Sequence, residues 1–541
     1  MAALLLIGTR MQVSAQWSED PAVNNRITPS NLGFYDPCCL TNADGVTYYF
    51  YIVPNIIDGI DHMQMRLQIY DAEGHRQYGA TGKVICNERN ITWTKFNQYT
   101  TLDADGNLIL MAYDLRLSAA DRYDFTFSIY KISPKGELLW DEPVILNGRR
   151  GDVNCTGLSM CATDDGGTAL AYSATSADGT HLVTHLERLD ADGQLLWPEP
   201  VVVEPENSTN RPFVVNNGKN EVMVVYADSE VQFNARVFDA EGNDVWQESV
   251  PVYSGGYSDG IHVYPSVNVQ EGPDGGVIFS VMDSGYEGRV VCLDRDGQYV
   301  FPTANYGTKV AGPDYQSTVP AVYFDPAEKA FFVAFANMAL YGSNGYGVNV
   351  QKFSYSGQRL WGDDGIVIDE TRTGQQTAAP YVRPAADGRI AVFYEKQAGT
   401  IYGSPVGSYI SLIDKDGRIV KEPQNFTTTL NIKNDFTVSP LIGGNHYIAS
   451  WTEKRANSTS ACIYSQYVNV DGNTSGIDHC PLTIDHSPLT IDHCFDLQGR
   501  AIKNVQCSMV NVQSKNGQCS MVNGQLKKGL YIVDGKKVVK P

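Results

Sequence analysis

Residues 189–197 read LDADGQLLW, a polar Asp-Gly turn that leads directly into two leucines and a tryptophan. Asp accepts hydrogen bonds from backbone N–H groups two residues on, and Gly takes the left-handed conformation that a tight turn needs. The stretch therefore predicts a hairpin between two short strands. Near-copies of it recur along most of the chain, and their spacing decides the fold.

The copies align on the turn glycine and form a series of eight. The glycines are Gly74, Gly136, Gly193, Gly242, Gly297, Gly357, Gly417 and Gly472, separated by 62, 57, 49, 55, 60, 60 and 55 residues. In six copies an aromatic residue follows the glycine by four positions: Tyr78, Trp140, Trp197, Trp246, Phe301 and Trp361. A fixed period with a fixed internal offset indicates a repeat architecture. We expect these aromatic residues to pack between repeats, with the four tryptophans buried.

A second marker lies upstream in each period. It is a turn followed by an apolar run that ends near Asp, Glu or Asn, as in DADGNLILMAYD (103–114) and ADGRIAVFYEK (386–396). Such runs predict buried strands. A proline precedes six of the runs (Pro37, Pro212, Pro265, Pro320, Pro380 and Pro440). We expect it at the first residue of a strand, where its missing N–H costs no ladder hydrogen bond.

Each period thus holds four short strands, the last headed by the motif LLW. A four-stranded sheet of this length, repeated about an axis, is a propeller blade. The sequence predicts an all-β protein with an eight-bladed propeller over residues 16–478. Because the last copy is degenerate, a seven-bladed ring is the alternative.

Two families resemble these repeats. The glycine-to-tryptophan offset resembles, in spacing only, the docking motif of quinoprotein-like propellers. A closer resemblance is to propeller repeats of large secreted bacterial proteins, carried by GGTALAYSA (166–174) and CIYSQYVNVDG (462–472). That resemblance implies the fold and leaves the ligand open.

The N-terminus carries an export pattern. Ala3–Ile7 is a short apolar core, and Val13 and Ala15 occupy the −3 and −1 positions of a small-residue cleavage site. We predict a signal peptide over residues 1–15, cleaved between Ala15 and Gln16; an ordinary N-terminal strand is the alternative. Because no other stretch approaches ~18 apolar residues, no membrane span is predicted.

Residues 479–494 repeat PLTIDH at a period of seven, which is typical of a linker that tolerates duplication. The duplication also creates a cluster of possible metal ligands, namely His479, Cys480, His486, His493 and Cys494. Duplication alone explains the spacing, so no metal site is predicted there.

Residues 495–541 contain FDLQGRAIKNV (495–505) and KKGLYIVDGKKVVKP (527–541). Both resemble the type A sorting domain of the type IX secretion system. The matching positions are Asp496, Leu497, Gly499, Arg500, Gly529, Tyr531, Ile532, Gly535, Lys536 and Lys537. The resemblance implies a small C-terminal β-sandwich read by the type IX machinery, and secretion or surface attachment in a Gram-negative bacterium. An ordinary C-terminal hairpin is the alternative.

Composition excludes some partners. The net charge of −20 argues against nucleic acid and anionic membrane surfaces. Eleven cysteines cannot all pair with one another, and the nearest neighbours are Cys38–Cys39 and Cys155 with Cys161.

Candidate catalytic and cofactor motifs are weak. The turns DADG, DRDG and DKDG resemble the start of calcium loops but lack the later ligands. GYSDG (256–260) matches Gly-x-Ser-x-Gly without the surrounding strand-to-helix turn. Arg116, Arg383 and Arg455 lie near strand ends, where solvated rim charges are the expected reading. We predict no catalytic residue, cofactor or metal.

A surface-displayed binding propeller for a glycan or protein is therefore the favoured function. Tyrosine-rich segments at 253–265 and 339–348 suit such a ligand. The alternative is a glycan-cleaving hydrolase, which would need two carboxylates at glycosidase spacing in the channel.

Overall fold

The computed structural model divides the chain into two compact units, Met1–Gly476 and Ile477–Pro541. The residues that the structure describes are 17–18, 20–57, 60–87, 100–114, 126–146, 153–204, 212–228, 232–255, 267–312, 315–317, 320–339, 345–371, 375–398, 404–429, 431–455 and 458–470, with the backbone of four short strands between 494 and 540.

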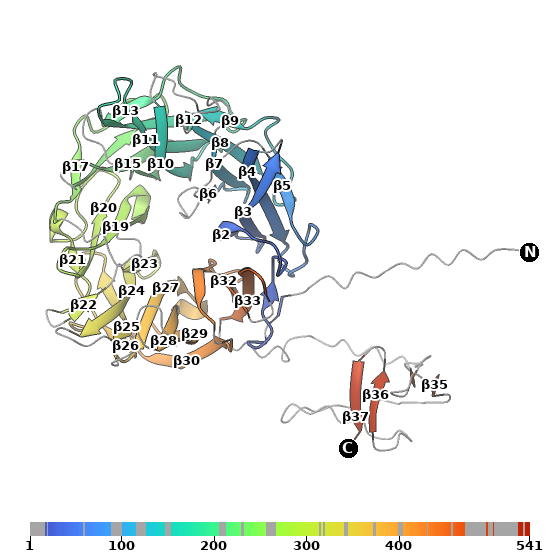
Figure 1. Ribbon diagram of the computed structural model, residues 1–541. Coiled ribbons are helices and arrows are strands. Elements are labelled where there is room, and N and C mark those ends of the chain that lie inside the picture. The colour runs from blue at the N-terminus through green and yellow to red at the C-terminus, as the bar shows by residue number, and fades with distance from the viewer. Residues whose placement is uncertain are drawn as a thin grey trace, which may run out of the picture. The chain divides into compact units, whose positions relative to one another are not determined.

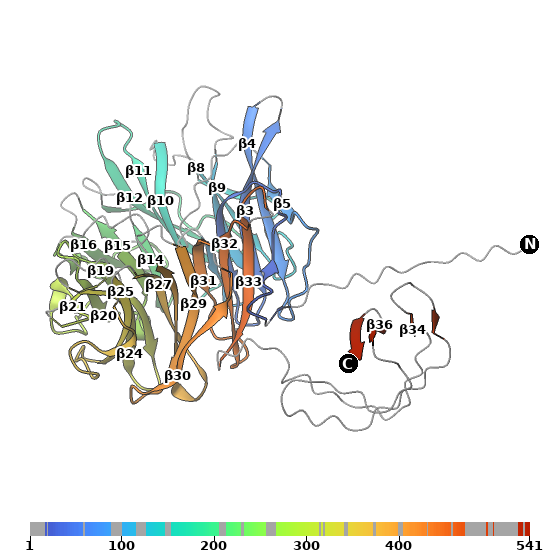
Figure 2. The ribbon, with the colours of Figure 1, turned by 60° about the horizontal axis from the view of Figure 1, so that its bottom comes forward.

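The first unit is a ring of eight antiparallel sheets (Figures 1 and 2), numbered here as blades 1 to 8. Blade 1 holds β2 (Tyr35–Thr41), β3 (Thr47–Ile57), β4 (Ile60–Tyr70) and β5 (Lys83–Cys86); blade 2 holds β6 (Thr100–Leu102), β7 (Leu108–Asp114), β8 (Thr126–Ile132) and β9 (Val144–Leu146). Blade 3 holds β10 (Val153–Ala162), β11 (Thr168–Thr175), β12 (Leu182–Leu189) and β13 (Val201–Glu204); blade 4 holds β14 (Phe213–Gly218), β15 (Glu221–Ala227), β16 (Phe233–Phe238) and β17 (Val250–Tyr253).

Blade 5 holds β18 (Val267–Glu271), β19 (Val277–Met282), β20 (Gly288–Leu293) and β21 (Thr308–Lys309). Blade 6 holds β22 (Tyr315–Ser317), β23 (Ala321–Asp325), β24 (Ala330–Ala339), β25 (Tyr346–Ser354) and β26 (Ile366–Asp369); blade 7 holds β27 (Gln375–Pro384), β28 (Ile390–Ala398), β29 (Ser404–Ile413) and β30 (Ile419–Thr427). Blade 8 holds β31 (Lys433–Val438), β32 (His446–Glu453), β33 (Cys462–Asn469) and β1 (Asn25–Arg26).

The all-β, eight-bladed prediction is confirmed, and the seven-bladed alternative is wrong. Within the described ranges the helices are three 3-10 turns, η2 (Pro273–Gly275), η3 (Ala304–Tyr306) and η4 (Ala386–Gly388). The core lies between neighbouring sheets. Met223 and Val225 of blade 4, for example, share one apolar cluster with Phe279 and Val281 of blade 5.

Pro212 directly precedes β14, close to the predicted strand-first position, but other prolines differ from that prediction. Pro37 and Pro380 lie inside inner strands, each at a shift in the pairing register. Pro320 falls between β22 and β23, so the inner strand of blade 6 is split. A missing N–H interrupts the ladder, and a bulge or break absorbs that interruption inside a strand.

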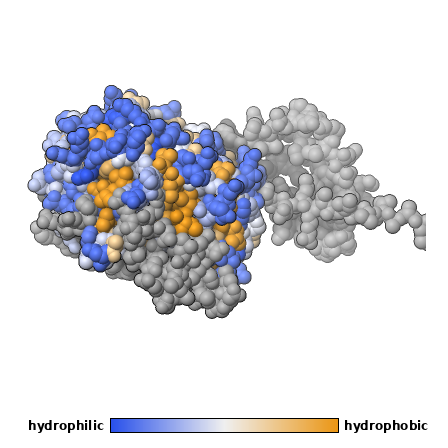
Figure 3. All heavy atoms as spheres, turned by 90° about the horizontal axis from the view of Figure 1, so that it is seen from above, coloured by the Kyte–Doolittle hydropathy of each residue, from blue (hydrophilic) through white to orange (hydrophobic). Residues whose placement is uncertain are grey.

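The motif LLW also differs from its prediction as a strand start. In blade 2, Leu138 forms an isolated bridge with Ile132, and the fourth strand begins only at Val144. The leucines are among the exposed apolar side chains of such segments: Leu138, Leu139, Leu195, Leu196, Val245 and Leu360. Figure 3 shows one face of the molecule, where apolar patches lie among hydrophilic ones.

The motif aromatics lie against the turn glycine of the next repeat. A Cβ added at Gly193 would meet the Trp140 ring at 2.7 Å, and one at Gly357 would meet the Phe301 ring at the same distance. Each glycine has a positive φ and leaves the flat surface on which the ring packs. The same placement holds for the pairs Tyr78 with Gly136, Trp197 with Gly242, Trp246 with Gly297, and Trp361 with Gly417.

The four tryptophans are not equally buried, contrary to expectation. Trp140 and Trp197 are buried, and their indole N–H groups donate at 3.0 Å to the carbonyls of Ala191 and Ala240 in the next repeat. Trp246 and Trp361 are half-buried and make no such bond within the described ranges. The hydrogen bond therefore accompanies full burial of the indole.

The ring closes through the N-terminus. β1 forms the outer strand of blade 8, pairing Arg26 with Tyr464 of β33. Trp17 stacks on Tyr70 at 5.1 Å and lies over Gly74, which is the position that a motif aromatic of blade 8 would occupy. We call residues 17–28 the clasp. The chain continues from the clasp into β2 of blade 1, and the clasp holds blade 8 through the pairing of β1 with β33.

In the second unit the backbone forms a sheet in the order β35 (Ala501–Ile502), β34 (Cys494–Phe495), β36 (Gly529–Val533) and β37 (Lys536–Lys540). Within the described parts of the chain, no helix is long and apolar enough to cross a bilayer.

Candidate functional site

A groove of about 690 Å³ lies between blades 5 and 6. One wall comes from blade 5, with Arg289 on β20, Thr303 and Gly307 beside η3, and Lys309 on β21. The other wall is the turn between β25 and β26, and the link between the blades completes the lining with Ala311 and Gly312. The turn between β25 and β26 contributes Gly357, Gln358, Arg359, Gly362 and Asp363 to the lining.

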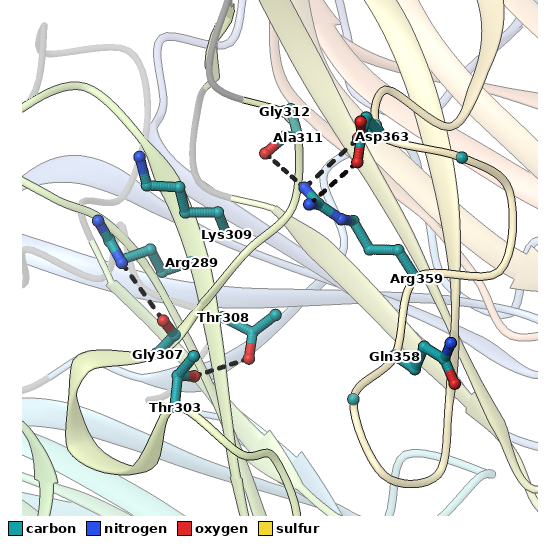
Figure 4. Close-up of a pocket in the computed structure, with 12 residues that line it drawn as sticks. Arg289, Thr303, Gly307, Thr308, Lys309, Ala311, Gly312, Gln358, Arg359 and Asp363 are labelled. Carbon is teal, nitrogen blue, oxygen red and sulfur yellow. Dashed lines mark hydrogen bonds and ion pairs between the residues drawn. The ribbon is translucent and has the colours of Figure 1, made fainter.

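Cations line both walls of the groove. Figure 4 shows Arg289 and Lys309 on one side and Arg359 on the other, each carried by a different strand or turn. The Arg359 guanidinium donates to the carbonyl of Ala311 at 2.8 Å and pairs with Asp363 at 3.2 Å. These bonds hold Arg359 across the junction of the two blades.

Arg289 and Lys309 form a network on the opposite wall. Arg289 donates to Asp283 at 2.6 Å and to Glu287 at 2.8 Å, and Lys309 donates to the same Glu287. Burial lowers the pKa of Arg289, but the ion pair with Asp283 outweighs it, so the pKa is raised overall. Arg289 is therefore charged at all physiological pH values.

The walls are otherwise polar and tightly turned. The hydroxyls of Thr303 and Thr308 lie 2.7 Å apart. Gly307 has φ of 69°, and a Cβ there would meet Arg289 at 3.1 Å, so glycine allows the close approach. Next to Gly307, the side chain of Tyr306 is 62% exposed.

The sequence contains one signal for this groove, the number of residues between the motif aromatic and the fourth strand. The fourth strand begins four residues after the motif aromatic in blades 2, 3 and 4, as from Trp140 to Val144. In blade 5 it begins seven residues after Phe301, and in blade 6 five after Trp361, a distance that blade 1 shares from Tyr78 to Lys83. Thr303, Gly307, Gly362 and Asp363 lie in these longer segments, so the groove is lined by two local insertions.

A second polar site is buried between blades 7 and 8. The carboxylate of Glu453, at the end of β32, accepts hydrogen bonds from Trp451 at 2.8 Å, Asn431 at 2.7 Å and Arg455 at 3.1 Å. Burial opposes ionisation of Glu453, but these donors outweigh it and lower its pKa. Glu453 is thus an ionised anchor for the start of blade 8.

Glu395, on β28, is the opposite case. Its side chain is buried, and among the described residues it accepts one hydrogen bond, from Ser408 at 3.4 Å. Burial raises the pKa of Glu395 to about 8, although the Lys433 ammonium works against the shift. Burial also lowers the pKa of Lys433. Because both carboxyl groups are almost fully buried, a sugar cannot reach them in this conformation.

Two of the three arginines singled out in the sequence are described, and each makes contacts of its own. Arg383 is held by the backbone carbonyls of Val438 and Ser439, and burial lowers its pKa. It is therefore not the solvated rim charge that was expected. Arg455 pairs with Glu453 and lies 3.8 Å from the centre of the Tyr464 ring. Arg116 lies outside the described ranges.

Cys38 and Cys39 are free thiols. Cys38 lies 3.3 Å from the Thr100 hydroxyl, and Cys39 bonds Ser450 of blade 8 at 3.4 Å. Burial raises the pKa of both thiols, that of Cys39 to about 12, which disfavours the reactive thiolate.

Asp71, Glu73 and His75 could offer metal ligands within 4.8 Å of one another. The ring of His75 lies 3.1 Å from an Asp71 oxygen. Asn107 and Asn243 donate to Asp103 and Asp239 in the same way in other repeats, at 2.9 and 3.0 Å. His75 therefore completes a turn, and we assign no metal here.

Several predicted residues lie outside the described ranges. They are the cleavage site Ala15–Gln16, the segment 256–260 and the cluster between His479 and His493. For the sorting motif, Asp496, Leu497, Gly499, Arg500 and Gly535 lie outside them, and only the backbone of Gly529, Tyr531, Ile532, Lys536 and Lys537 is described.

No family model matches the chain, and neither does any curated protein. Among solved structures, the α-L-arabinanase of Penicillium chrysogenum is 14% identical, over 63% of this chain and 98% of the other, with a TM-score of 0.35. An ulvan lyase of polysaccharide lyase family 25 is 10% identical, over 85% and 96%, with a TM-score of 0.41. The propeller domain of the trilobed protease of Pyrococcus furiosus is 10% identical, over 75% and 97%, with a TM-score of 0.37. At such low sequence identity, these similarities concern the fold alone.

Proposed function

We propose that the protein is a non-catalytic binding propeller whose ligand, a glycan or an extended protein segment, lies in the groove between blades 5 and 6. The observation that carries this proposal is the placement of Arg359 and Lys309 on facing walls, each fixed by a carboxylate. Preorganised donors of this kind favour binding because little side-chain order is lost when the ligand arrives.

The arrangement of carboxylates favours binding over catalysis. Asp283, Glu287 and Asp363 each pair with a cation at the groove. Glycoside hydrolysis needs one carboxylic acid and one carboxylate flanking an accessible sugar. Glu395 and Glu453, a pair whose pKa values diverge, are buried in another part of the ring, and Glu271, whose pKa is also raised by burial, does not line the groove.

Substitution of Arg359 by methionine is expected to weaken binding about tenfold, since hydrogen bonds from charged groups contribute about 1.5–3 kcal/mol. Arg236→Met is the matched control, because Arg236 is equally exposed (30%) and pairs with Asp244 in blade 4. Binding is measured on immobilised xylan, glucomannan, polygalacturonate, alginate and casein.

If Arg359→Met binds as tightly as the parent, the proposal that the ligand binds in this groove is refuted. Release of reducing ends from a bound polysaccharide would instead support the hydrolase alternative.

We also propose that the protein is exported, with the signal peptide at residues 1–15 and the sorting tail at 495–541 as its addresses. Deletion of Lys527–Pro541 is then expected to trap it in the periplasm without lowering its melting temperature, since the apolar clusters of the first unit are formed by its own residues. A full-length chain with this segment scrambled is the control for length. Fractionation and a melting curve are measured together; surface display of the truncated chain would contradict the proposal.

A further inference from the structure

The charges around the groove cancel. Arg289, Lys309 and Arg359 are matched by Asp283, Glu287 and Asp363, and every cation is engaged by at least one carboxylate. The whole chain carries a net charge of −20, which repels an anionic polymer at long range. Neither the local nor the overall field therefore favours an anionic ligand.

Hydrogen-bond donors nevertheless remain available. The Lys309 ammonium has three donors, and the described contacts use one of them, to Glu287. The Nε–H group of Arg359 makes no hydrogen bond within the described ranges, whereas the rest of the guanidinium bonds Ala311 and Asp363. Hydroxyl groups can accept from these donors and in turn donate to Asp363 or Gln358.

A sugar suits the groove better than a peptide. Peptides that add to a sheet need a ladder of several residues, but β21 contains only Thr308 and Lys309. The lining has no large apolar side chain that would form a pocket for a peptide side chain. Tyr306 is not a lining residue itself but adjoins Gly307, which is, and its exposed ring offers one flat apolar face that matches the C–H face of a sugar ring.

We infer that the groove takes an uncharged glycan, with Lys309 and Arg359 bonding its hydroxyls and Tyr306 stacking on a sugar ring; this inference rests on the proposed function. The test compares xylan and glucomannan with polygalacturonate and alginate, and with casein, using the full chain. We expect the neutral polysaccharides to bind, with affinity almost unchanged between about 0.05 and 0.5 M NaCl. Tyr306→Ala is expected to weaken that binding about tenfold, whereas Tyr306→Phe keeps the ring and the affinity.

The outcomes separate the two claims. Preferential binding of an acidic polysaccharide or casein that Arg359→Met weakens would overturn the neutral glycan and leave the groove in place. Equal affinities of Tyr306→Ala and the parent for a neutral polysaccharide would also overturn it. If no probe binds, or if Arg359→Met leaves binding unchanged, both the proposed binding groove and the proposed uncharged glycan are refuted.

Discussion

A chain that begins at Pro29 is expected to be less stable than the full chain by about 5 kcal/mol or more, because it loses the clasp. The truncation removes Trp17 and Ile27, which are 8% and 0% exposed, and the strand that covers β33. The freed edge of β33 presents unpaired backbone groups, so the truncated ring is also expected to aggregate. Urea denaturation and light scattering measure the two effects.

Two controls separate the clasp from chain length. Deletion of residues 1–16 leaves every described clasp residue in place and is expected to leave stability unchanged. Trp17→Ala is expected to cost ~3–5 kcal/mol, like Trp197→Ala. Trp17→Phe is expected to cost much less, because the Trp17 indole N–H is buried without a hydrogen-bond partner in the described structure. A truncated ring as stable as its parent would contradict closure by the clasp.

The two buried glutamates are expected to respond in opposite directions to substitution by glutamine. Glu453→Gln should destabilise the ring by about 3–5 kcal/mol, because it leaves Arg455 without its anionic partner. Trp451 and Asn431 donate to different oxygens of Glu453, so the glutamine also turns its amide donor toward one of these two N–H groups. Glu395→Gln replaces a carboxyl that stays protonated up to about pH 8 by a neutral group of nearly the same shape, and should stabilise the ring at pH 8 by up to about 4 kcal/mol.

The signs follow from the pKa values. The pKa of Glu395 is raised from 4.5 to about 8, so between these values the folded chain holds a proton that the unfolded chain has lost. Stability therefore falls as pH rises through this window, and Glu395→Gln removes that slope. The groups facing Glu395 are Lys433, Glu453, Ser408 and Tyr381.

The pKa of Glu453 is lowered, so the stability that its ionised form contributes is fully present above the ordinary pKa of a glutamate and is lost only in acid. Urea denaturation of both variants between pH 5 and 8 measures the slopes. An unchanged slope in Glu395→Gln would contradict the assigned protonation state.

The ring was predictable because its information is local. The offset from Gly193 to Trp197 places a turn and a packing residue within five positions, and repetition supplies the rest. The closure was not predictable in this way. Trp17 and Arg26 lie outside the repeats, and Arg26 pairs with Tyr464, more than 400 residues away.

The groove needed the fold before it could be found. Arg289, Lys309 and Arg359 come from three segments of two blades and carry no motif. The extra residues after Phe301 and Trp361 are present in the sequence, but they are recognised as insertions only when the fourth strands of the blades are aligned. Likewise, Glu395 and Glu453 lie near the ends of similar apolar runs. Their charge states are opposite because they differ in burial and in hydrogen-bond donors, which the sequence does not show.

A crystal structure of the protein soaked with xylohexaose tests the binding account most directly. We expect sugar density between β21 and the turn before β26, with hydroxyls in hydrogen-bond contact with Lys309 Nζ and Arg359 Nε and a sugar ring against Tyr306. Density in the centre of the ring, with the groove between blades 5 and 6 empty, would contradict it.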